Sequence, residues 1–463
     1  MNEPENSPSR ETWTERLFRP VDIASLAAFR IVFGGCMLFE NARYWIEGYL
    51  YKTLVAPEFH FKFYGFTWIE ELPAGAMLGV FTLMILSSLG VLLGAFYRTS
   101  ATILFVTFSY CFLLEACAYR NHFYLLALLA LIMIFLPAAR AWSVDAKLKP
   151  AKESQWTPQW TVWLLQFQLG IVYFFAGVAK IDPIWISGES FRAIIDSESH
   201  SSSVTGFLKQ PWVLGIFIWS GMLFDLTITF FLLWARTRWF AFLGAAGFHL
   251  TNALFLVSVG IFPWFMLLGS TIFFPPNWPR ALLSKIDSGS WPLHLTPVDA
   301  ASLPFSRRRS LIVTVLAVHV AIQIFLPLRQ HLYPGNTSWT HEGHRWAWRM
   351  KLVPKSLTSI RIFTVDPDTG QTIELNDNIQ YAVAPWQRER MGRQPDLLLQ
   401  FVHDLDAKLP EKLGRDFPIY ADVRVTMDGN LAQPLIDPTV DLSKEKWELG
   451  PASWIAPYHR TRY

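Results

Sequence analysis

The chain has little charge and almost no cysteine. Only 17% of its 463 residues are Asp, Glu, Lys or Arg, against about 25% in soluble domains, and this shortage excludes a soluble globular protein. The net charge of +3 is too small to indicate nucleic-acid binding. The three cysteines, Cys36, Cys111 and Cys117, all lie in apolar stretches. We therefore expect neither a disulfide framework nor a thiolate metal site.

Familiar catalytic motifs are also missing. The sequence contains no HExxH, GxSxG or P-loop motif, and no GxGxxG between a strand and a helix. A metal-dependent, serine-hydrolase or nucleotide-dependent mechanism therefore has no support, and we expect no metal site.

Long apolar runs dominate the chain instead, with 52% hydrophobic residues, 37 Phe and 21 Trp. A bilayer core of about 30 Å needs about 20 mostly apolar residues per helix. The sequence therefore predicts a polytopic α-helical membrane protein with about nine transmembrane helices. These spans are expected near 22–42, 74–96, 101–118, 123–139, 161–181, 212–234, 238–257, 259–275 and 310–328.

The composition changes after residue 328. Residues 329–463 are polar and contain alternating runs such as SIRIFTVDPDTGQTIEL and IYADVRVTMDGN, which indicate a hairpin at Asp368-Thr369-Gly370 and a strand that enters a turn at Asp428-Gly429. We therefore expect a transmembrane helical catalytic domain over 1–328 and a mainly β domain over 329–463.

The distribution of Lys and Arg predicts the orientation. Short loops on one side carry Arg98, Arg140, Lys147 and Arg236, and such loops are usually cytoplasmic. We expect a cytoplasmic N-terminus without a cleavable signal. An odd number of spans then places the C-terminal domain outside the cytoplasm, as in the periplasm of a bacterial inner-membrane protein.

Ionisable residues at membrane depth are costly and are therefore candidates for function. Lys180 follows an apolar helix and is flanked by Ala176, Gly177 and Val178. Apolar surroundings favour a neutral amine, which can act as a base. The alternative is a lysine that anchors the helix end by reaching to the interface.

Two further pairs of polar residues are expected at the same outer depth. Asn121 and His122 open the fourth span; they could polarise a bound oxygen group or simply form an N-cap. His249 and Asn252 share one helical face, and a structural, hydrogen-bonded histidine is the alternative there. Together with Lys180, these groups suggest chemistry on a lipid-borne molecule.

Two deep charges, Arg30 in the first span and Asp225 in the sixth, are expected to form a structural ion pair, because either charge alone would be costly. Glu115 could belong to either the Asn121 group or this pair.

At these residues the sequence resembles the vitamin K-dependent γ-glutamyl carboxylase family, in a short bacterial-type form. The resemblance covers nearly the whole chain. It is carried by RPVDIASLAAFRIVFG, NHFYLLALLA, SVDA, IVYFFAGVAKIDPIW, FHLTNALFLVSVGIFPWFML, NWPR and IYADVRVTMDGNLAQPLIDPTVDL. The segment around Lys180 is the most specific of these.

The resemblance implies that reduced vitamin K is converted by O2 to its epoxide while CO2 is added to the γ-carbon of a protein glutamate. It implies that Lys180 deprotonates the hydroquinone and that His122 is a second catalytic residue. Asn121, His249 and Asn252 would bind the quinone. The partners would be a Glu-containing protein or peptide together with membrane quinone and lipids, with phylloquinol or menaquinol, O2 and CO2 as co-substrates.

Departures from the family leave alternatives open. The C-terminal region contains no cysteine, so the disulfide of animal members is absent, and Ala179 stands where those members have a second lysine. A quinol epoxidase or oxygenase without protein carboxylation is one alternative. A non-catalytic quinone- or lipid-binding membrane protein is the other.

Overall fold

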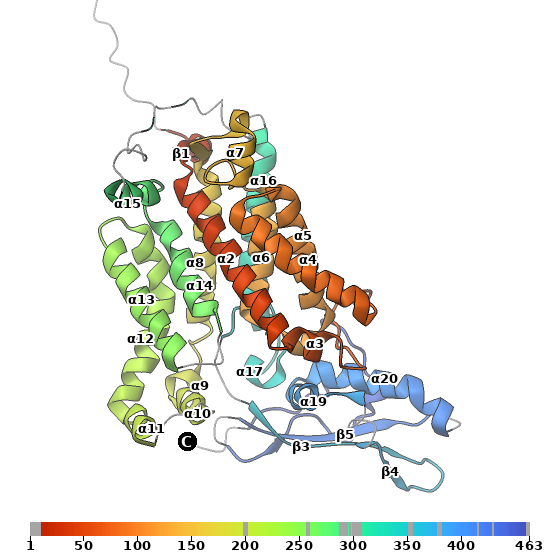
Figure 1. Cartoon of the computed structure of the whole chain (residues 1–463). Coiled ribbons are helices and arrows are strands. Elements are labelled where there is room, and N and C mark those ends of the chain that lie inside the picture. The colour runs from red at the N-terminus through yellow and green to blue at the C-terminus, as the bar shows by residue number, and fades with distance from the viewer. Residues whose placement is uncertain are drawn as a thin grey trace, which may run out of the picture.

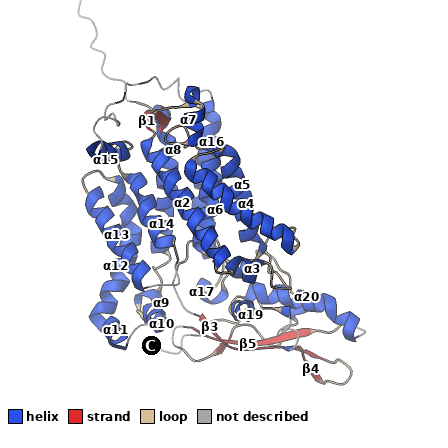
Figure 2. Ribbon diagram, viewed as in Figure 1, coloured by secondary structure: helices blue, strands red, loops and turns tan. Residues whose placement is uncertain are grey.

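The computed structural model describes residues 11–197, 202–255, 260–286, 295, 298, 308–350, 355–376, 382–413, 416–427 and 430–459. Long helices form an upright bundle, and a small sheet lies beyond one end of it (Figures 1 and 2). The helices α19 and α20 lie between the bundle and the sheet (Figure 1). The C-terminal region is thus placed against the end of the bundle that carries the candidate residues.

The bundle consists of helices that run between its two ends, together with shorter ones at those ends. The long or apolar helices are α2 (Ala24–Ile46), α4 (Ala74–Leu93), α5 (Tyr97–Leu114), α6 (Asn121–Phe135), α8 (Gln159–Val178), α12 (Pro211–Leu233), α13 (Arg238–Phe255), α14 (Phe262–Gly269) and α16 (Arg309–Leu328). The shorter ones are α1 (Trp13–Phe18), α3 (Tyr49–Leu54), α7 (Val144–Leu148), α9 (Pro183–Ile186), α10 (Glu189–Ser197), α11 (Ser202–Leu208) and α15 (Trp278–Ile286). Strands β1 (Pro20–Asp22) and β2 (Trp156–Pro158) pair antiparallel.

A helix lies at each of the nine expected positions, but these helices differ in their capacity to span a membrane. Within the described part of the chain, five are long and apolar enough, namely α4, α5, α8, α12 and α16. The helix α6 and the segment Phe262–Phe273 are apolar but shorter. A helical membrane protein is thus supported, whereas the number of nine spans stays a prediction.

Helices α8 and α12 approach closely because glycines face the contact. A Cβ atom at Gly177 would lie 2.7 Å from the backbone nitrogen of Leu226 and 3.0 Å from the carbonyl carbon of Asp225. Two helical turns earlier on α8, the carbonyl of Gly170 accepts a hydrogen bond from the hydroxyl of Thr229 on α12 at 3.2 Å. This approach brings the end of α8, and with it Lys180, beside Asp225.

Substitution of Gly177 by alanine is expected to lower the stability of the bundle by about 1–3 kcal/mol, the usual cost of overpacking, because the added methyl meets backbone atoms that cannot rotate away. Thermal unfolding in detergent would measure this loss. Gly215 on α12 is the matched control, since a Cβ there would meet no heavy atom within 4 Å. A Gly177→Ala variant as stable as Gly215→Ala would contradict the close helix contact.

The expected ion pair between Arg30 and Asp225 is wrong. Arg30 is fully buried and donates to the backbone carbonyls of Ala138, Ala141 and Trp142 at 3.2, 3.3 and 2.6 Å. These carbonyls belong to the loop between α6 and α7, and buried backbone carbonyls need a donor. Arg30 therefore supplies hydrogen bonds to the backbone of a chain reversal near one end of the bundle.

The C-terminal region contains an antiparallel sheet in the order β4-β3-β5-β6. Its strands are β3 (Lys355–Val365), β4 (Thr372–Glu374), β5 (Ile419–Met427) and β6 (Gln433–Pro434). The predicted hairpin is confirmed: Val365 pairs with Thr372, and Gly370 has a φ of +68° that suits a tight turn. The turn predicted at Asp428-Gly429 lies outside the described residues.

Helices contribute more to this region than a mainly β domain would have. They are α17 (Thr337–Thr340), α19 (Pro385–Met391) and α20 (Pro395–Leu413). In α20, Leu398, Phe401, Val402 and Leu405 are buried at the three- and four-residue spacing of an amphipathic helix. The sequence alternates more clearly in the neighbouring strands than it shows a helical period here, and for that reason it predicts a mainly β domain. The region is better described as mixed α and β.

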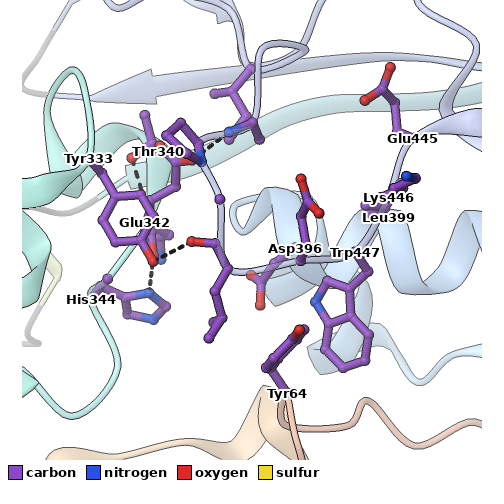
Figure 3. Close-up of a pocket in the computed structure, with 18 of the residues that line it drawn as sticks. Tyr64, Tyr333, Thr340, Glu342, His344, Asp396, Leu399, Glu445, Lys446 and Trp447 are labelled. Carbon is purple, nitrogen blue, oxygen red and sulfur yellow. Dashed lines mark hydrogen bonds between the residues drawn. The ribbon is translucent and has the colours of Figure 1, made fainter.

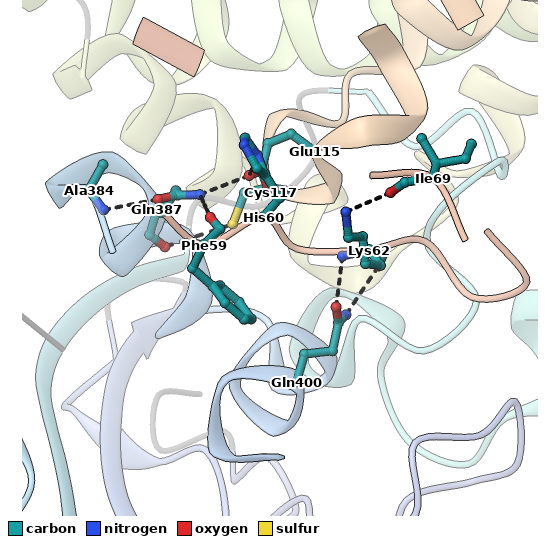
Figure 4. Close-up of polar contacts among 9 residues, drawn as sticks. All are labelled: Phe59, His60, Lys62, Ile69, Glu115, Cys117, Ala384, Gln387 and Gln400. Carbon is teal, nitrogen blue, oxygen red and sulfur yellow. Dashed lines mark hydrogen bonds and ion pairs between the residues drawn. The ribbon is translucent and has the colours of Figure 1, made fainter. Parts of the chain in front are cut away.

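Polar contacts fix the C-terminal region to the bundle (Figure 4). The amide of Gln387 on α19 donates to the Glu115 carboxylate and to the carbonyl of Phe59, both at 2.8 Å. The amide of Gln400 on α20 pairs with the backbone of Lys62, accepting at 2.8 Å and donating at 3.2 Å. Glu115 thus belongs to the contact between the two parts of the chain, and not to either group considered from the sequence.

Candidate functional site

One cavity of about 730 Å³ lies between the start of α6 and helices α8, α12, α13 and α14. Six residues singled out from the sequence line it: Asn121, His122, Lys180, Asp225, His249 and Asn252. Arg349 and Arg390 from the C-terminal region also line it. Residues that are as much as 269 positions apart in sequence, from Asn121 to Arg390, therefore share one chamber.

Lys180 lies just beyond the end of α8 and is 7% exposed. Its ammonium group donates to the carboxylate of Asp225, itself 3% exposed. The Nζ atom also lies 5.3 Å from the ring centroid of Trp185, a cation–π distance. Lys180 therefore does not reach out to solvent as a simple anchor. We expected only apolar surroundings for this amine, but the carboxylate of Asp225 faces it as well.

His249 is held by a tyrosine. Its Nε2 atom lies 2.6 Å from the hydroxyl of Tyr173, which is 3.3 Å from the hydroxyl of Ser270. Ser270 in turn donates to the carbonyl of Met266 at 2.7 Å. This chain of hydrogen bonds fixes the imidazole at the cavity wall, and Asn252 lines the cavity one helical turn further on.

Asn121 and His122 have different surroundings although they are adjacent. The Asn121 amide accepts from the Tyr119 hydroxyl at 2.9 Å and donates to the Arg349 carbonyl at 2.6 Å. Asn121 is the first residue of α6, whose cap is Arg120 without a side-chain capping bond, so the N-cap interpretation is wrong. The His122 ring packs 5.6 Å from Phe262 and lines the cavity.

Aromatic rings form flat walls around this chamber. Phe224 on α12 and Phe248 on α13 stack with ring centroids 4.2 Å apart and an interplanar angle of 20°. Phe191 and Phe217 stack at 5.1 Å, also with an angle of 20°. All four residues line the cavity. Such walls suit a planar, apolar ring system, with the polar groups of Lys180 and His122 available to its edge.

Comparisons with known proteins give two matches. Residues 18–278, more than half of the chain, match the model of the HTTM domain. Residues 308–461 match the model of the vitamin K-dependent gamma-carboxylase lumenal domain. The chain belongs to the vitamin K-dependent gamma-carboxylase family. No solved structure matches it significantly.

This family membership fits an integral membrane protein whose C-terminal region lies outside the cytoplasm, because the second match is to a lumenal domain. That match begins at residue 308 and so includes α16. The cavity of this gamma-carboxylase relative is lined by residues of both matched regions.

Sequence reasoning missed several residues that line the cavity: Arg120, Tyr173, Arg349 and Arg390. The sequence identifies Asp225 as a deep charge but predicts Arg30 as its partner in place of Lys180. Tyr173 lies on α8, seven residues before Lys180, which follows the end of that helix, and a spacing of about two helical turns is a usable signal. Arg349 and Arg390 arrive only through the folding of the C-terminal region.

A second cavity of about 440 Å³ lies in the C-terminal region (Figure 3). Its lining includes Tyr64, Glu342, His344, Asp396 and Trp447, and it shares no lining residue with the Lys180 cavity. Its walls are more polar and bear charges of both signs. The groups expected to act on a quinol are all in the other cavity.

Proposed function

We propose that the chain is a vitamin K-dependent γ-carboxylase-type enzyme. It would couple the oxygenation of reduced vitamin K to its epoxide with the γ-carboxylation of a protein glutamate by CO2. The observation that carries this proposal is the Lys180–Asp225 pair, buried in a cavity that residues of both family domains line.

The cavity fits the head group of a prenylated quinol. Its volume of about 730 Å³ lies within the range of about 300–1,000 Å³ that is common for small-molecule sites. The stacked pairs Phe224–Phe248 and Phe191–Phe217 supply apolar faces. His122 and Asn252 supply polar groups for the ring oxygens. When bound, reduced vitamin K would supply the reducing equivalents that O2 consumes as epoxide and water form.

The Lys180–Asp225 pair can take up the proton of a hydroxyl group without leaving a net charge in the cavity. The ammonium–carboxylate pair is neutral, and transfer of the shared proton gives a Lys180 amine beside an Asp225 carboxylic acid; this amine accepts the proton of the hydroxyl group. A second proton makes the pair cationic, and the anion that it leaves behind neutralises that charge. In a medium of low dielectric constant, this balance removes much of the cost of separating charge.

Burial of the cavity protects a strongly basic reaction from water. Lys180 and Asp225 are almost fully buried, as is His249 at 4% exposure. Arg349, Met350 and Arg390 add a cover from the C-terminal region. Water exclusion strengthens the electrostatic interactions within the site and prevents protonation of a carbanion before CO2 can add.

We further propose the finer features of topology and partners. The protein would cross a bacterial inner membrane nine times, with a cytoplasmic N-terminus, and would divide near residue 328 into a catalytic helical domain and an extracytoplasmic domain. The substrate would be a glutamate in a protein or peptide, and the quinone would come from the membrane. The five candidate spans support the membrane location, and the lumenal-domain match supports the extracytoplasmic placement of the C-terminal domain.

Product analysis of the purified protein tests the proposal. Supplied with phylloquinol, O2, labelled bicarbonate and a Glu-containing peptide, it should form the epoxide and attach acid-stable label to the peptide. Epoxide without labelled peptide would favour the quinol epoxidase alternative, for which the quinol-facing residues alone suffice. Absence of epoxide in folded protein would leave a non-catalytic quinone- or lipid-binding protein.

A further inference from the structure

Two arginines line the Lys180 cavity without a hydrogen-bond acceptor or an acidic partner for their guanidinium groups among the described residues. Arg120 precedes α6, and its guanidinium lies 5.8 Å from the Tyr49 ring and 5.7 Å from the Phe123 ring. Arg390 comes from α19 of the C-terminal region, and the two residues line the same cavity. Like charges near a low-dielectric cavity are costly unless an anion joins them.

The acidic groups nearby are already engaged. Glu40 accepts two hydrogen bonds from Arg43, at 2.8 and 3.0 Å, and Asp225 accepts from Lys180. Asp182 caps α9 by accepting from the backbone of Ile184 at 2.8 Å. In the described part of the chain, none of them forms an ion pair with Arg120 or Arg390.

We infer that Arg120 and Arg390 bind the γ-carboxylate of the substrate glutamate, next to the quinol site. This inference rests on the proposed function and names the substrate-binding residues of the same cavity. A guanidinium offers two parallel N–H donors that match a carboxylate. Arg349 is less suited to this role because its two terminal nitrogens already donate to Gln330 and Ser338, at 2.7 and 2.6 Å.

Two positive groups also suit the change of charge in the reaction. A glutamate side chain enters with one carboxylate, loses a proton from its γ-carbon to the base that quinol oxygenation supplies in the proposed function, and forms a carbon–carbon bond to CO2. The electron pair of the broken C–H bond becomes the new bond, and the product carries two carboxylates on one carbon. Arginines placed where this second charge develops would stabilise the dicarboxylate more than they stabilise the single starting carboxylate.

Peptide binding without quinol tests the inference apart from catalysis. A fluorescent Glu-containing peptide and its Gln-containing twin would be titrated with the detergent-solubilised full chain. We expect the wild type to bind the Glu peptide at least tenfold more tightly. Arg120→Gln and Arg390→Gln should each weaken Glu-peptide binding about 10- to 100-fold, as expected for loss of a hydrogen bond to a charged group, and Arg390→Lys should restore part of the affinity.

Arg361→Gln is the matched control, because Arg361 lies on β3, is half exposed and pairs with Glu374 in solvent. It should leave both peptide affinities unchanged. Equal affinity of the wild type for the two peptides would overturn the inference, as would Glu-peptide binding that the folded Arg120→Gln and Arg390→Gln variants retain.

Turnover separates this inference from the proposed function. In an active enzyme, the arginine variants should raise the KM for the Glu peptide at least tenfold, with the KM for quinol changing less than about twofold. A raised KM for quinol or for bicarbonate instead would overturn the assignment while the proposed function stands. Arginine-dependent Glu-peptide binding by a protein that forms no epoxide would support the carboxylate site and refute the proposed function.

Discussion

Replacement of Lys180 by alanine should reduce epoxide formation from reduced vitamin K by about 10²- to 10⁴-fold, the range that a general base contributes. The amine is buried, lines the aromatic cavity and is held by Asp225, which is the placement that a base acting on a bound hydroxyl group needs. Epoxide yield from saturating quinol would be measured by chromatography. Normal epoxide formation by the folded variant would show that Lys180 is not the base.

The matched control is Lys209→Ala. Lys209 pairs with Asp196 near the same end of the bundle, but their side chains are 37% and 56% exposed, and Lys209 does not line the cavity. Its removal should leave the epoxide yield unchanged. This comparison separates loss of the buried amine from a general loss of positive charge.

Stability has to be distinguished from catalysis at this pair. Removal of one member of a buried ion pair commonly costs about 3–5 kcal/mol because the other charge stays uncompensated. The double variant Lys180→Ala/Asp225→Ala removes both charges and should unfold at a higher temperature than either single variant. It should form no more epoxide than Lys180→Ala, because residues that act as one unit are not additive.

The sequence was sufficient to predict which polar groups share a depth, because helix length and direction determine depth. Lys180, His122 and His249 were placed together in this way, and they line one cavity. Helix periodicity does not determine which helix lies beside which. For that reason the sequence pairs Asp225 with Arg30 when its neighbour is Lys180, and only the glycines at positions 170 and 177 give a local indication of the α8–α12 contact.

Contacts between distant segments set the other limit. Arg349 reaches Asn121 across 228 residues, and Gln387 reaches Glu115 across 272. Neither contact leaves a periodic pattern in the sequence, because each depends on how the C-terminal region folds onto the bundle. The helix α20 was missed for a local reason, since its apolar period of three and four residues lies between two strands that alternate more clearly.

The contact between the bundle and the C-terminal region should weaken strongly when Glu115 is replaced by alanine. Its carboxylate is fully buried and accepts from the backbone of Cys117 and the amide of Gln387, both at 2.8 Å, and lies 3.2 Å from Nδ1 of His60 (Figure 4). Each buried donor left without an acceptor costs about 1–3 kcal/mol. Of the three partners only Gln387 lies across the contact, so docking itself should weaken by about 1–3 kcal/mol.

Hydrogen exchange of α19 would measure this loss, because weaker docking exposes its amides more often. Glu115→Gln should show an intermediate effect, since a carboxamide must turn its NH2 group towards one of the same donors. Glu374→Ala is the control: Glu374 is about half exposed, and such a surface pair contributes at most about 1 kcal/mol. Unchanged exchange of α19 in Glu115→Ala would show that docking does not depend on this carboxylate.

The same carboxyl should make docking depend on pH. Burial raises the pKa of Glu115 above its ordinary value of 4.5, so the folded protein holds this proton more tightly than the unfolded chain does. The stabilisation from that proton is fully present below pH 4.5 and is lost as the pH rises through the raised value. Protection of the α19 amides against hydrogen exchange should therefore decline in the wild type as the pH rises from 4.5 through the raised pKa of Glu115. It should stay constant in Glu115→Gln, whose carboxamide does not titrate. An identical pH profile in both proteins would assign the dependence to another group.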